Sequence, residues 1–301
     1  MDKYLLRDDR DIALQQWRLK YNRKQLDESY TQFFKSLQEI IYLYTGVGTF
    51  IVDYKWQIEF LKNLSVHHPL LNLDWLTYTP GQFYYSVSRV FEMFDIQARP
   101  LYFTQNAREA IPLPSIALEP GHYIYVDDDI ASGSTYRYVR EKLSLQRVQI
   151  VGCINLAQAY CDYQGAQVNI YDILDPRDFL IGAHTGGLVC QWREGQVRVP
   201  YLSPWVNLET RARVAKNKCQ DFTRAVIEAN LQFFTANDIH WSDIDANTAR
   251  VLQHYLYSMH EPHTHSSIRV WCHDYLRNLK SGTWSLKNTN SLPVFGTGAK
   301  S

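Results

Sequence analysis

Residues 122–139, HYIYVDDDIASGSTYRYV, carry the main evidence for the fold that we expect of this sequence. Its apolar start, HYIYV, predicts a buried strand that ends directly at three acids, Asp127, Asp128 and Asp129. A loop of small residues follows, and STYRYVREKL then predicts a helix. A strand that leads through a short loop into a helix is the unit from which helix-covered parallel sheets are built.

The neighbouring segments continue this alternation. Downstream, VQIVGCINLA and VNIYDIL predict two more strands, and GLVCQW and QVRVPY predict short strands that turn at Glu194–Gly195. Upstream, WLTYT predicts the first strand of the core and QFYYSVSRVFEMF predicts a helix. A short apolar run, PLYF, then gives way to a polar stretch from Gln105 to Gly121. The sequence therefore predicts an α/β core with a parallel sheet over residues 70–204.

The two ends of the chain show helical spacing instead. Apolar residues recur every three or four positions between Trp17 and Ile41, and a second such run spans Trp56 to Leu64. We therefore expect an N-terminal helical element over residues 1–69. Similar spacing predicts a C-terminal helical subdomain over residues 205–280, and the polar residues 281–301 predict a flexible tail.

Composition excludes several classes of protein. The 46% hydrophobic content supplies a core, which argues against disorder, and 31 basic residues balance 31 acidic ones, which argues against a nucleic-acid platform. The five cysteines include no CxxC pair, so neither a disulfide framework nor a zinc ribbon is expected. No run of about 18 apolar residues could cross a bilayer. We expect a soluble, cytoplasmic protein with no membrane or nucleic-acid partner.

The loop after the acids has the chemistry of a phosphate site. Small residues let backbone N–H groups approach an anion, and the start of the next helix adds further donors. The acids before the loop would repel the same phosphate, but they suit sugar hydroxyls or a magnesium ion. A ligand with a phosphate at one end and a diol at the other would satisfy both halves. The alternative is an ordinary capped turn with no ligand.

The segment from Ile124 to Thr135 resembles the phosphoribosyl-pyrophosphate (PRPP) motif of the type I phosphoribosyltransferases. The resemblance implies that Asp127 and Asp128 are the catalytic pair, contacting the ribose hydroxyls and, directly or indirectly, Mg²⁺. It also implies that a loop wraps the 5′-phosphate, formed by Ala131, Ser132, Gly133, Ser134 and Thr135. The fold expected from it is a type I phosphoribosyltransferase-like parallel sheet with added helices at both ends.

Two weaker resemblances flank the motif. Upstream, Thr79, Pro80, Gly81 and Gln82 stand where that family has its pyrophosphate loop, the alternative being a plain turn. Downstream, the segment from Asp175 to Gly182 resembles the base-binding edge of hypoxanthine-type members. Phe179 would then stack on the base, the alternative for this ring being packing in the core.

The sequence also departs from the family pattern. Hypoxanthine-type enzymes have an acid at the first loop position, which handles the ring proton of the base, whereas this chain has Ala131. Either another group takes up the ring proton, or the reaction needs no such group. Asp129 is an additional acid, and Arg108 is the one cation between Gln105 and Gly121, where many members keep a mobile lid.

The histidines carry no assigned role. The cluster His254, His260, His263 and His265 has no spacing that matches a closed zinc site, and Pro262 favours a polar loop there. His184 follows the base-binding segment closely enough to reach a ligand.

The expected function is an enzyme that uses PRPP and Mg²⁺ to transfer a 5-phosphoribosyl group to a nitrogenous base, with release of pyrophosphate. The alternative is a regulator of the same fold that binds PRPP or a nucleotide without catalysis. The sequence leaves the acceptor and the formation of a homodimer open.

Overall fold

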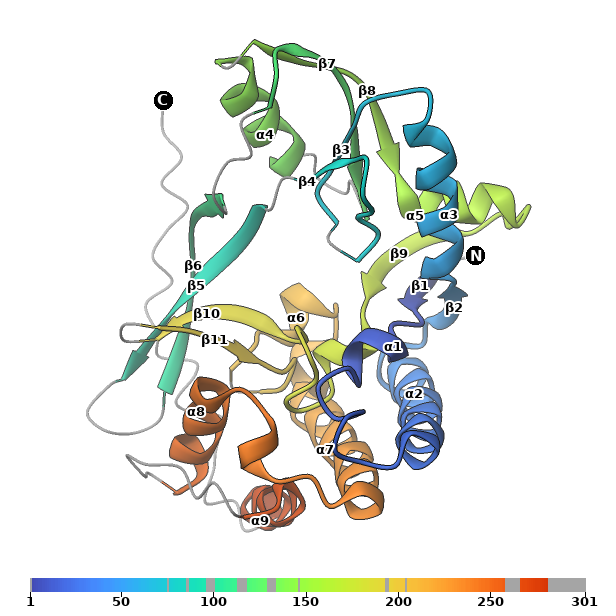
Figure 1. Cartoon of the computed structure of the whole chain (residues 1–301). Coiled ribbons are helices and arrows are strands. Elements are labelled where there is room, and N and C mark those ends of the chain that lie inside the picture. The colour runs from blue at the N-terminus through green and yellow to red at the C-terminus, as the bar shows by residue number, and fades with distance from the viewer. Residues whose placement is uncertain are drawn as a thin grey trace.

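The motif strand lies at the centre of a parallel sheet. In the computed structural model, described residues are 2–74, 76–84, 87–95, 101–112, 118–128, 134–145, 147–192, 195–203, 205–257 and 266–280. The sheet has the order β4-β3-β7-β8 and consists of β3 (Leu70–Asn72), β4 (Phe83–Tyr84), β7 (Gly121–Asp127) and β8 (Val148–Asn155). It occupies the upper half of Figure 1.

Helices cover both faces of this sheet because the residues of β7 alternate. Tyr123 and Tyr125 pack on one face with Val139 and Leu143 of α4 (Ser134–Ser144). Val126 packs on the other face, in a cluster with residues of α3 (Tyr54–Ser65) and α5 (Leu156–Tyr163). The predicted strand, helix, strand order around the motif is confirmed.

The first 69 residues, predicted to be helical, also contain two strands. β1 (Asp2–Arg7) lies between β2 (Gly48–Val52) and β9 (Asn169–Leu174), and all three strands are parallel. Tyr4 and Leu6 join the largest core cluster, whereas Leu5 faces a smaller one, so β1 is buried on both faces. A short apolar run buried on both sides has no alternation to identify it as a strand. The helical part of the prediction is confirmed by α2 (Arg23–Thr45) and α3.

A third sheet corrects another prediction. QFYYSVSRVFEMF, predicted as a helix, contains strands β4 and β5 (Val87–Asp95). β5 pairs with β6 (Leu101–Pro112), which includes much of the polar stretch, and with the hairpin of β10 (Leu188–Trp192) and β11 (Gly195–Val199). Aromatic and β-branched residues suit a strand as well as a helix, and pairing with distant strands decides between them.

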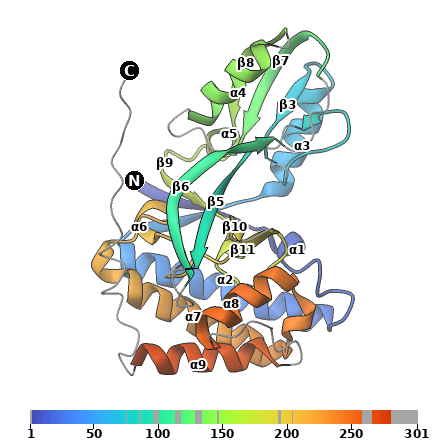
Figure 2. The same ribbon diagram turned by 90° about the vertical axis from the view of Figure 1, so that its left-hand side faces the viewer.

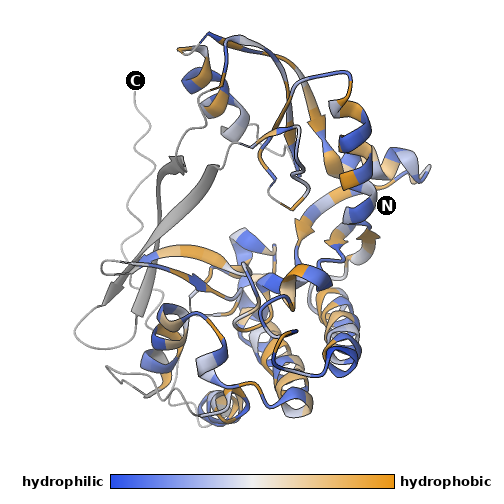
Figure 3. Cartoon of the chain, viewed as in Figure 1, coloured by the Kyte–Doolittle hydropathy of each residue, from blue (hydrophilic) through white to orange (hydrophobic). Residues whose placement is uncertain are grey.

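The helices at the two ends of the chain share one core. α7 (Cys219–Asn237) packs against both α2 and α9 (Ile268–Lys280), and α8 (Ala246–Tyr257) contacts β11. Figures 1 and 2 show these helices together below the strands, and Figure 3 shows apolar residues on them. The remaining short elements are α1 (Arg10–Ala13), α6 (Leu208–Arg211) and the 3-10 turns η1 (Pro176–Asp178), η2 (Lys216–Lys218) and η3 (Trp241–Asp243).

The largest hydrophobic cluster combines buried residues between Tyr4 and Ile41 with buried residues between Leu174 and Leu279. The helices after residue 204 are therefore packed into the same core as the N-terminal residues. Among the helices that the structure describes, none has the length and apolar character needed to span a membrane.

Candidate functional site

The carboxyl ends of β3 and β7 bring two predicted ligand segments together. These strands are adjacent and parallel, with Asn72 opposite Val126, and the Leu73 N–H donates to the Val126 carbonyl over 2.9 Å. Asp127 and Asp128 come directly after Val126, and the loop that contains Thr79–Gln82 begins at the same edge. Ligands of open parallel sheets bind beyond this edge of the strands.

The loop after β3 is held by its own polar side chains. Asn72 Nδ2 donates to Gln82 Oε1 at 3.0 Å and to Thr77 Oγ1 at 3.2 Å, while Asn72 Oδ1 accepts from the Asp74 N–H at 2.9 Å. Gly81 has φ +98°, which suits glycine at the turn before Gln82. The strand before this loop is Leu70–Asn72, so the prediction of a strand over WLTYT is wrong by several residues.

Two polar atoms in this loop have no partner among the described residues. Thr79 Oγ1 and Gln82 Nε2 are buried and form no hydrogen bond, although their residues are only 7% and 6% exposed. A buried polar group without a partner costs about 1–3 kcal/mol, so each such group needs an explanation. A bound anion that accepts from both groups would supply one.

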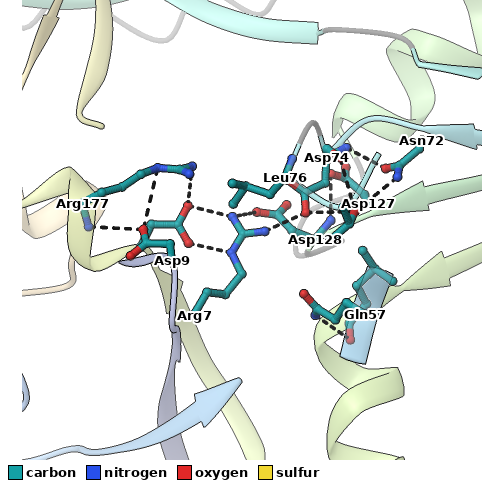
Figure 4. Close-up of polar contacts among 12 residues, drawn as sticks. Arg7, Asp9, Gln57, Asn72, Asp74, Leu76, Asp127, Asp128 and Arg177 are labelled. Atoms are coloured by element: carbon teal, nitrogen blue, oxygen red, sulfur yellow. Dashed lines mark hydrogen bonds and ion pairs between the residues drawn. The ribbon is translucent and has the colours of Figure 1, made fainter. Parts of the chain in front are cut away.

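Arg7, the last residue of β1, joins the ends of the two parallel sheets (Figure 4). Its Nη1 donates to Asp74 Oδ2 at 2.7 Å, and its Nη2 donates to Asp128 Oδ2 at 3.1 Å. Its Nε and Nη2 donate to the two carboxylate oxygens of Asp175 at 2.6 and 2.8 Å. One guanidinium thus fixes carboxylates that follow β3, β7 and β9.

A second arginine extends the cluster into η1. Arg177 Nη2 donates to Asp175 Oδ2 at 2.9 Å, and its Nε lies 3.8 Å from Asp9 Oδ2. The Tyr30 hydroxyl of α2 donates to the other oxygen of Asp9. The segment Asp175–Arg177, expected at the base-binding edge, therefore contributes charges to this group of side chains. We call the group the Arg7 cluster; it consists of Arg7, Asp9, Asp74, Asp128, Asp175 and Arg177.

Burial, together with the neighbouring charges, shifts the pKa values of the carboxyls in and next to this cluster. Burial and the neighbouring Asp128 raise the pKa of Asp127 to about 8, and burial raises that of Asp9 to about 7. Burial also raises the pKa of Asp74. Burial acts in the same direction on Asp175, but Arg7 and Arg177 outweigh it and lower the pKa of that carboxyl.

Asp128 is the accessible member among the carboxylates that Arg7 holds. Its side chain is 36% exposed, against 5% for Asp74 and 8% for Asp175. Asp127 is more enclosed and accepts from the Tyr125 hydroxyl at 2.7 Å. Asp128 can therefore contact a ligand, whereas Asp74 and Asp175 hold the framework.

The predicted 5′-phosphate loop lies mostly outside the described residues. Asp129, Ala131, Ser132 and Gly133 belong to that part, and the structure resumes at Ser134, the first residue of α4, followed by Thr135. The turn at Glu194 and the histidines His260, His263 and His265 also lie outside the described residues. His254 is 4% exposed within α8.

Phe179 lies in the core. Its side chain has no exposed surface, and its ring packs against Tyr201 and Phe222 with centroid distances of 5.4 and 6.0 Å. Phe179 thus packs in the core, the alternative to base stacking that the sequence left open. Its ring has no exposed face that could stack on a base.

Magnesium was expected at Asp127 and Asp128. Within the described residues, no group of three or more His, Cys, Asp or Glu side chains is arranged to hold a metal ion. Mg²⁺ is commonly bound by one or two carboxylates together with water and substrate phosphates. The accessible carboxylate of Asp128 therefore fits a magnesium ion that arrives with a phosphorylated ligand.

No protein-family model, curated protein or solved structure matches this chain. The functional argument therefore depends on the residues of the site. Sequence reasoning missed Arg7 and Asp74, because a charged residue at the end of a strand identifies a site only once the strand is known. Arg177 lay within the segment expected to bind the base, but its pairing with Asp175 was not predicted.

Proposed function

We propose that this chain binds PRPP with Mg²⁺ and transfers its 5-phosphoribosyl group to a nitrogen of an acceptor, releasing pyrophosphate. One observation carries the proposal. The loop with the unpartnered Thr79 and Gln82 groups follows one of two adjacent parallel strands, and Asp127 and Asp128 follow the other. Hydrogen-bond donors that could serve a diphosphate and carboxylates that could serve ribose hydroxyls thus lie at one sheet edge, which supports the proposal.

Each end of PRPP has suitable partners in the proposal. Asp128 accepts hydrogen bonds from the ribose hydroxyls, because its carboxylate is the accessible one. Thr79 Oγ1 and Gln82 Nε2 donate to the diphosphate, and residues 131–135 with the start of α4 bind the 5′-phosphate. Arg7 offsets the charge of Asp74 and Asp128, so that a diphosphate can bind beside them.

Breaking the bond from C1 to the diphosphate oxygen leaves positive charge on the ribose and negative charge on pyrophosphate. Mg²⁺ supplies charge stabilisation to the departing oxygens when bound. The protein supplies position: Asp128 fixes the ribose hydroxyls, and Asp127, whose pKa is about 8, retains a proton near neutral pH and limits the negative charge at the site.

A non-catalytic PRPP or nucleotide sensor is the second candidate. The burial of Phe179 favours it, because the ring that would stack on a base in the resembling enzymes lies in the core. The sequence also lacks the acid at Ala131.

Two measurements on the same sample separate the candidates. PRPP with Mg²⁺ should raise the melting temperature, since a ligand that binds only the folded state stabilises it, and ribose 5-phosphate should do so less. Release of pyrophosphate with any member of a panel of bases identifies the enzyme. A thermal shift without pyrophosphate release identifies the sensor, and no shift at millimolar PRPP contradicts both candidates.

The variant Asp128→Asn tests the site itself. Loss of a charged hydrogen bond costs about 1.5–3 kcal/mol, so PRPP affinity should fall roughly tenfold to a hundredfold. Inorganic phosphate, which lacks the ribose, should bind as before. The matched control is Asp162→Asn on the exposed face of α5, which should leave PRPP affinity unchanged.

A further inference from the structure

A cavity of about 280 Å³ lies outside the Arg7 cluster. It is enclosed by the loop that follows η1, the β10–β11 hairpin and the start of α8, which Figure 1 shows next to one another. Its apolar lining includes Leu180, Val189, Val197 and Pro200. Its polar lining includes Gln16, His184, Arg198, Asp245 and Thr248. Apolar walls with a few convergent polar groups are typical of small-molecule sites.

Arg198 is the cation of this cavity, and it lacks a counter-ion within the described residues. Its Nη1 donates to the carbonyls of Thr185 and Gly187 at 2.8 and 3.4 Å. In the described part of the chain its Nε and Nη2 form no hydrogen bond, and neither atom is among the buried atoms without a partner. Burial lowers the pKa of Arg198 and outweighs Asp178, which raises that pKa electrostatically. A partly desolvated guanidinium with no directly bound carboxylate is unfavourable, and a ligand carboxylate or phosphate would relieve that cost.

Asp178, which acts electrostatically on Arg198, and Asp245 of the cavity lining both accept hydrogen bonds from backbone groups. Asp178 Oδ1 accepts from the Gly187 N–H at 2.8 Å, and Asp245 Oδ1 accepts from the Thr248 N–H at 2.8 Å. Both acids thus fix the backbone of the cavity walls. Neither comes within 4 Å of the Arg198 nitrogens as an ion-pair partner.

His184 gives the cavity a second polar group. Its ring forms no hydrogen bond with the described residues, whereas its backbone N–H donates to the Ala13 carbonyl at 3.1 Å. Burial, together with Arg198 and Arg177, lowers the pKa of His184, which favours the neutral imidazole. A neutral imidazole offers one donor and one acceptor to a ligand.

We propose that this cavity binds a small heteroaromatic ring that carries one carboxylate. Arg198 pairs with the carboxylate through Nε and Nη2, the fork that matches a planar carboxylate, and the apolar residues contact the ring. Pockets for drug-sized ligands start at about 300 Å³, and this cavity of about 280 Å³ is slightly smaller. A single ring therefore suits its volume better than a nucleotide does.

The same compound is the acceptor of the proposed reaction, a step that depends on the proposed function. The cavity loop continues from η1, whose Arg177 belongs to the Arg7 cluster, and Tyr84, two residues after Gln82, contributes to the electrostatic environment of Arg198. A bond forms between an unprotonated ring nitrogen and C1 as the bond from C1 to pyrophosphate breaks. Pyrophosphate leaves with the electron pair, and the ring nitrogen becomes positive. No proton leaves the ring, which fits the absence of an acid at Ala131.

Calorimetry with the full chain tests the binding site. The probes are the three pyridine monocarboxylates, the corresponding carboxamides and benzoate. We expect at least one carboxylate to bind at least tenfold more tightly than its carboxamide, and Arg198→Gln to remove that preference. Arg198→Lys keeps the positive charge but loses the paired donors of the guanidinium, so it should retain part of the preference for the carboxylate. The control Arg277→Gln changes an exposed arginine of α9 and should bind like the unaltered chain.

The outcomes separate this inference from the proposed function. Equal affinity for carboxylates and carboxamides, no binding of any probe, or full affinity in a folded Arg198→Gln variant overturns the inference. Carboxylate binding through Arg198 without pyrophosphate release from PRPP keeps the site and rejects its role as acceptor site. Pyrophosphate release with another base, unaffected by Arg198→Gln, keeps the proposed function and rejects the acceptor assignment.

Discussion

Arg7 uses four hydrogen bonds to hold Asp74, Asp128 and Asp175 at the ends of three strands. Two of these carboxylates are almost fully buried, as is Arg7 itself. Removing one partner of a buried ionic cluster leaves uncompensated charge, which is more costly than the cluster is favourable. Arg7 therefore matters for stability mainly because its loss would leave Asp74 and Asp175 buried without a cation.

Replacement of Arg7 should be strongly destabilising. We expect Arg7→Met to lower the free energy of unfolding by about 3–5 kcal/mol, because it leaves Asp74 and Asp175 buried without a cation. Arg7→Lys keeps the charge but loses the paired contacts to Asp175, so its loss should be smaller. Urea denaturation measures both variants, with Arg277→Met, at an exposed position of α9, as the control. Equal stability of Arg7→Met and the control would contradict the structural role of the cluster.

Asp127 should make stability depend on pH. Its pKa is about 8 in the folded chain and near 4 when unfolded, so the folded state binds more protons between these values. Stability from this group is therefore fully present below pH 4 and is lost as pH rises through 8. Asp127→Asn cannot ionise, so relative to the unaltered chain it should gain on the order of 4 kcal/mol at pH 9 over pH 5.

Urea midpoints at pH 5, 7 and 9 for the Asp127→Asn variant and the unaltered chain provide the measurement. Asp162→Asn, at an exposed position, serves as the control and should show no such trend. A constant difference between Asp127→Asn and the unaltered chain at all three pH values would show that Asp127 is already ionised at pH 5.

The residues of the site were predictable where they belong to one continuous motif. Asp127 and Asp128 follow the motif strand directly, and their position was evident from the sequence. Arg7 reaches Asp128 from a position 121 residues away, a contact that no local pattern encodes. Phe179 shows the opposite problem, because an aromatic ring suits a ligand and a core equally well until its neighbours are known.

At the level of elements, the loop between η1 and β10 depends on glycines that admit no side chain. Gly187 has φ +82°, and a Cβ there would lie 2.3 Å from the Val199 carbonyl oxygen of β11. Gly165, after α5, has φ +62° but no atom within 4 Å of such a Cβ. The two positions share the backbone conformation and differ in the available space.

Alanine at these two glycines should separate the two effects. Gly165→Ala should lower the free energy of unfolding by about 1 kcal/mol, the cost of the left-handed conformation alone. Gly187→Ala adds a clash with the β11 backbone, and we expect a loss on the order of 3 kcal/mol or more. Thermal and urea denaturation of the two variants give the comparison. A loss at Gly187 no greater than at Gly165 would mean that the hairpin shifts freely.

Elements with a distinctive local pattern were predicted and those decided by distant pairing were not. α4, β7, β8, β9 and the β10–β11 hairpin lie where the sequence predicts them. β5 was predicted as a helix because its apolar residues have helical spacing, and its pairing with β6 and β10 is set by the rest of the sheet. β1 was missed because both of its faces are buried.

At the level of the whole molecule, the helices after residue 204 complete a core that begins at the N-terminus. The Trp17 ring lies 5.7 Å from that of Phe233, and its Nε1 donates to the Asp243 carbonyl at 3.1 Å. The Tyr4 hydroxyl of β1 donates to the Ala212 carbonyl at 2.8 Å. The boundary at residue 204 that was expected from the sequence thus divides residues that pack together.

Truncation at that boundary should therefore prevent folding. A fragment of residues 1–204 would expose the buried faces of α2 and of Trp17, so we expect it to be insoluble or to unfold without a cooperative transition. A fragment of residues 1–280 removes only the segment predicted to be a flexible tail, and it should unfold cooperatively at the same urea concentration as the full chain. Circular dichroism and the urea transition distinguish these results.

A point variant tests the same claim without truncation. Phe234 of α7 is fully buried and packs against Trp17. If the C-terminal helices share one cooperative core with the N-terminus, Phe234→Ala should destabilise the molecule by about 3–5 kcal/mol in a single transition. That transition should be the same whether it is followed by tryptophan fluorescence or by loss of PRPP binding. Two separate transitions, with only one moved by Phe234→Ala, would instead identify residues 205–280 as an independent subdomain.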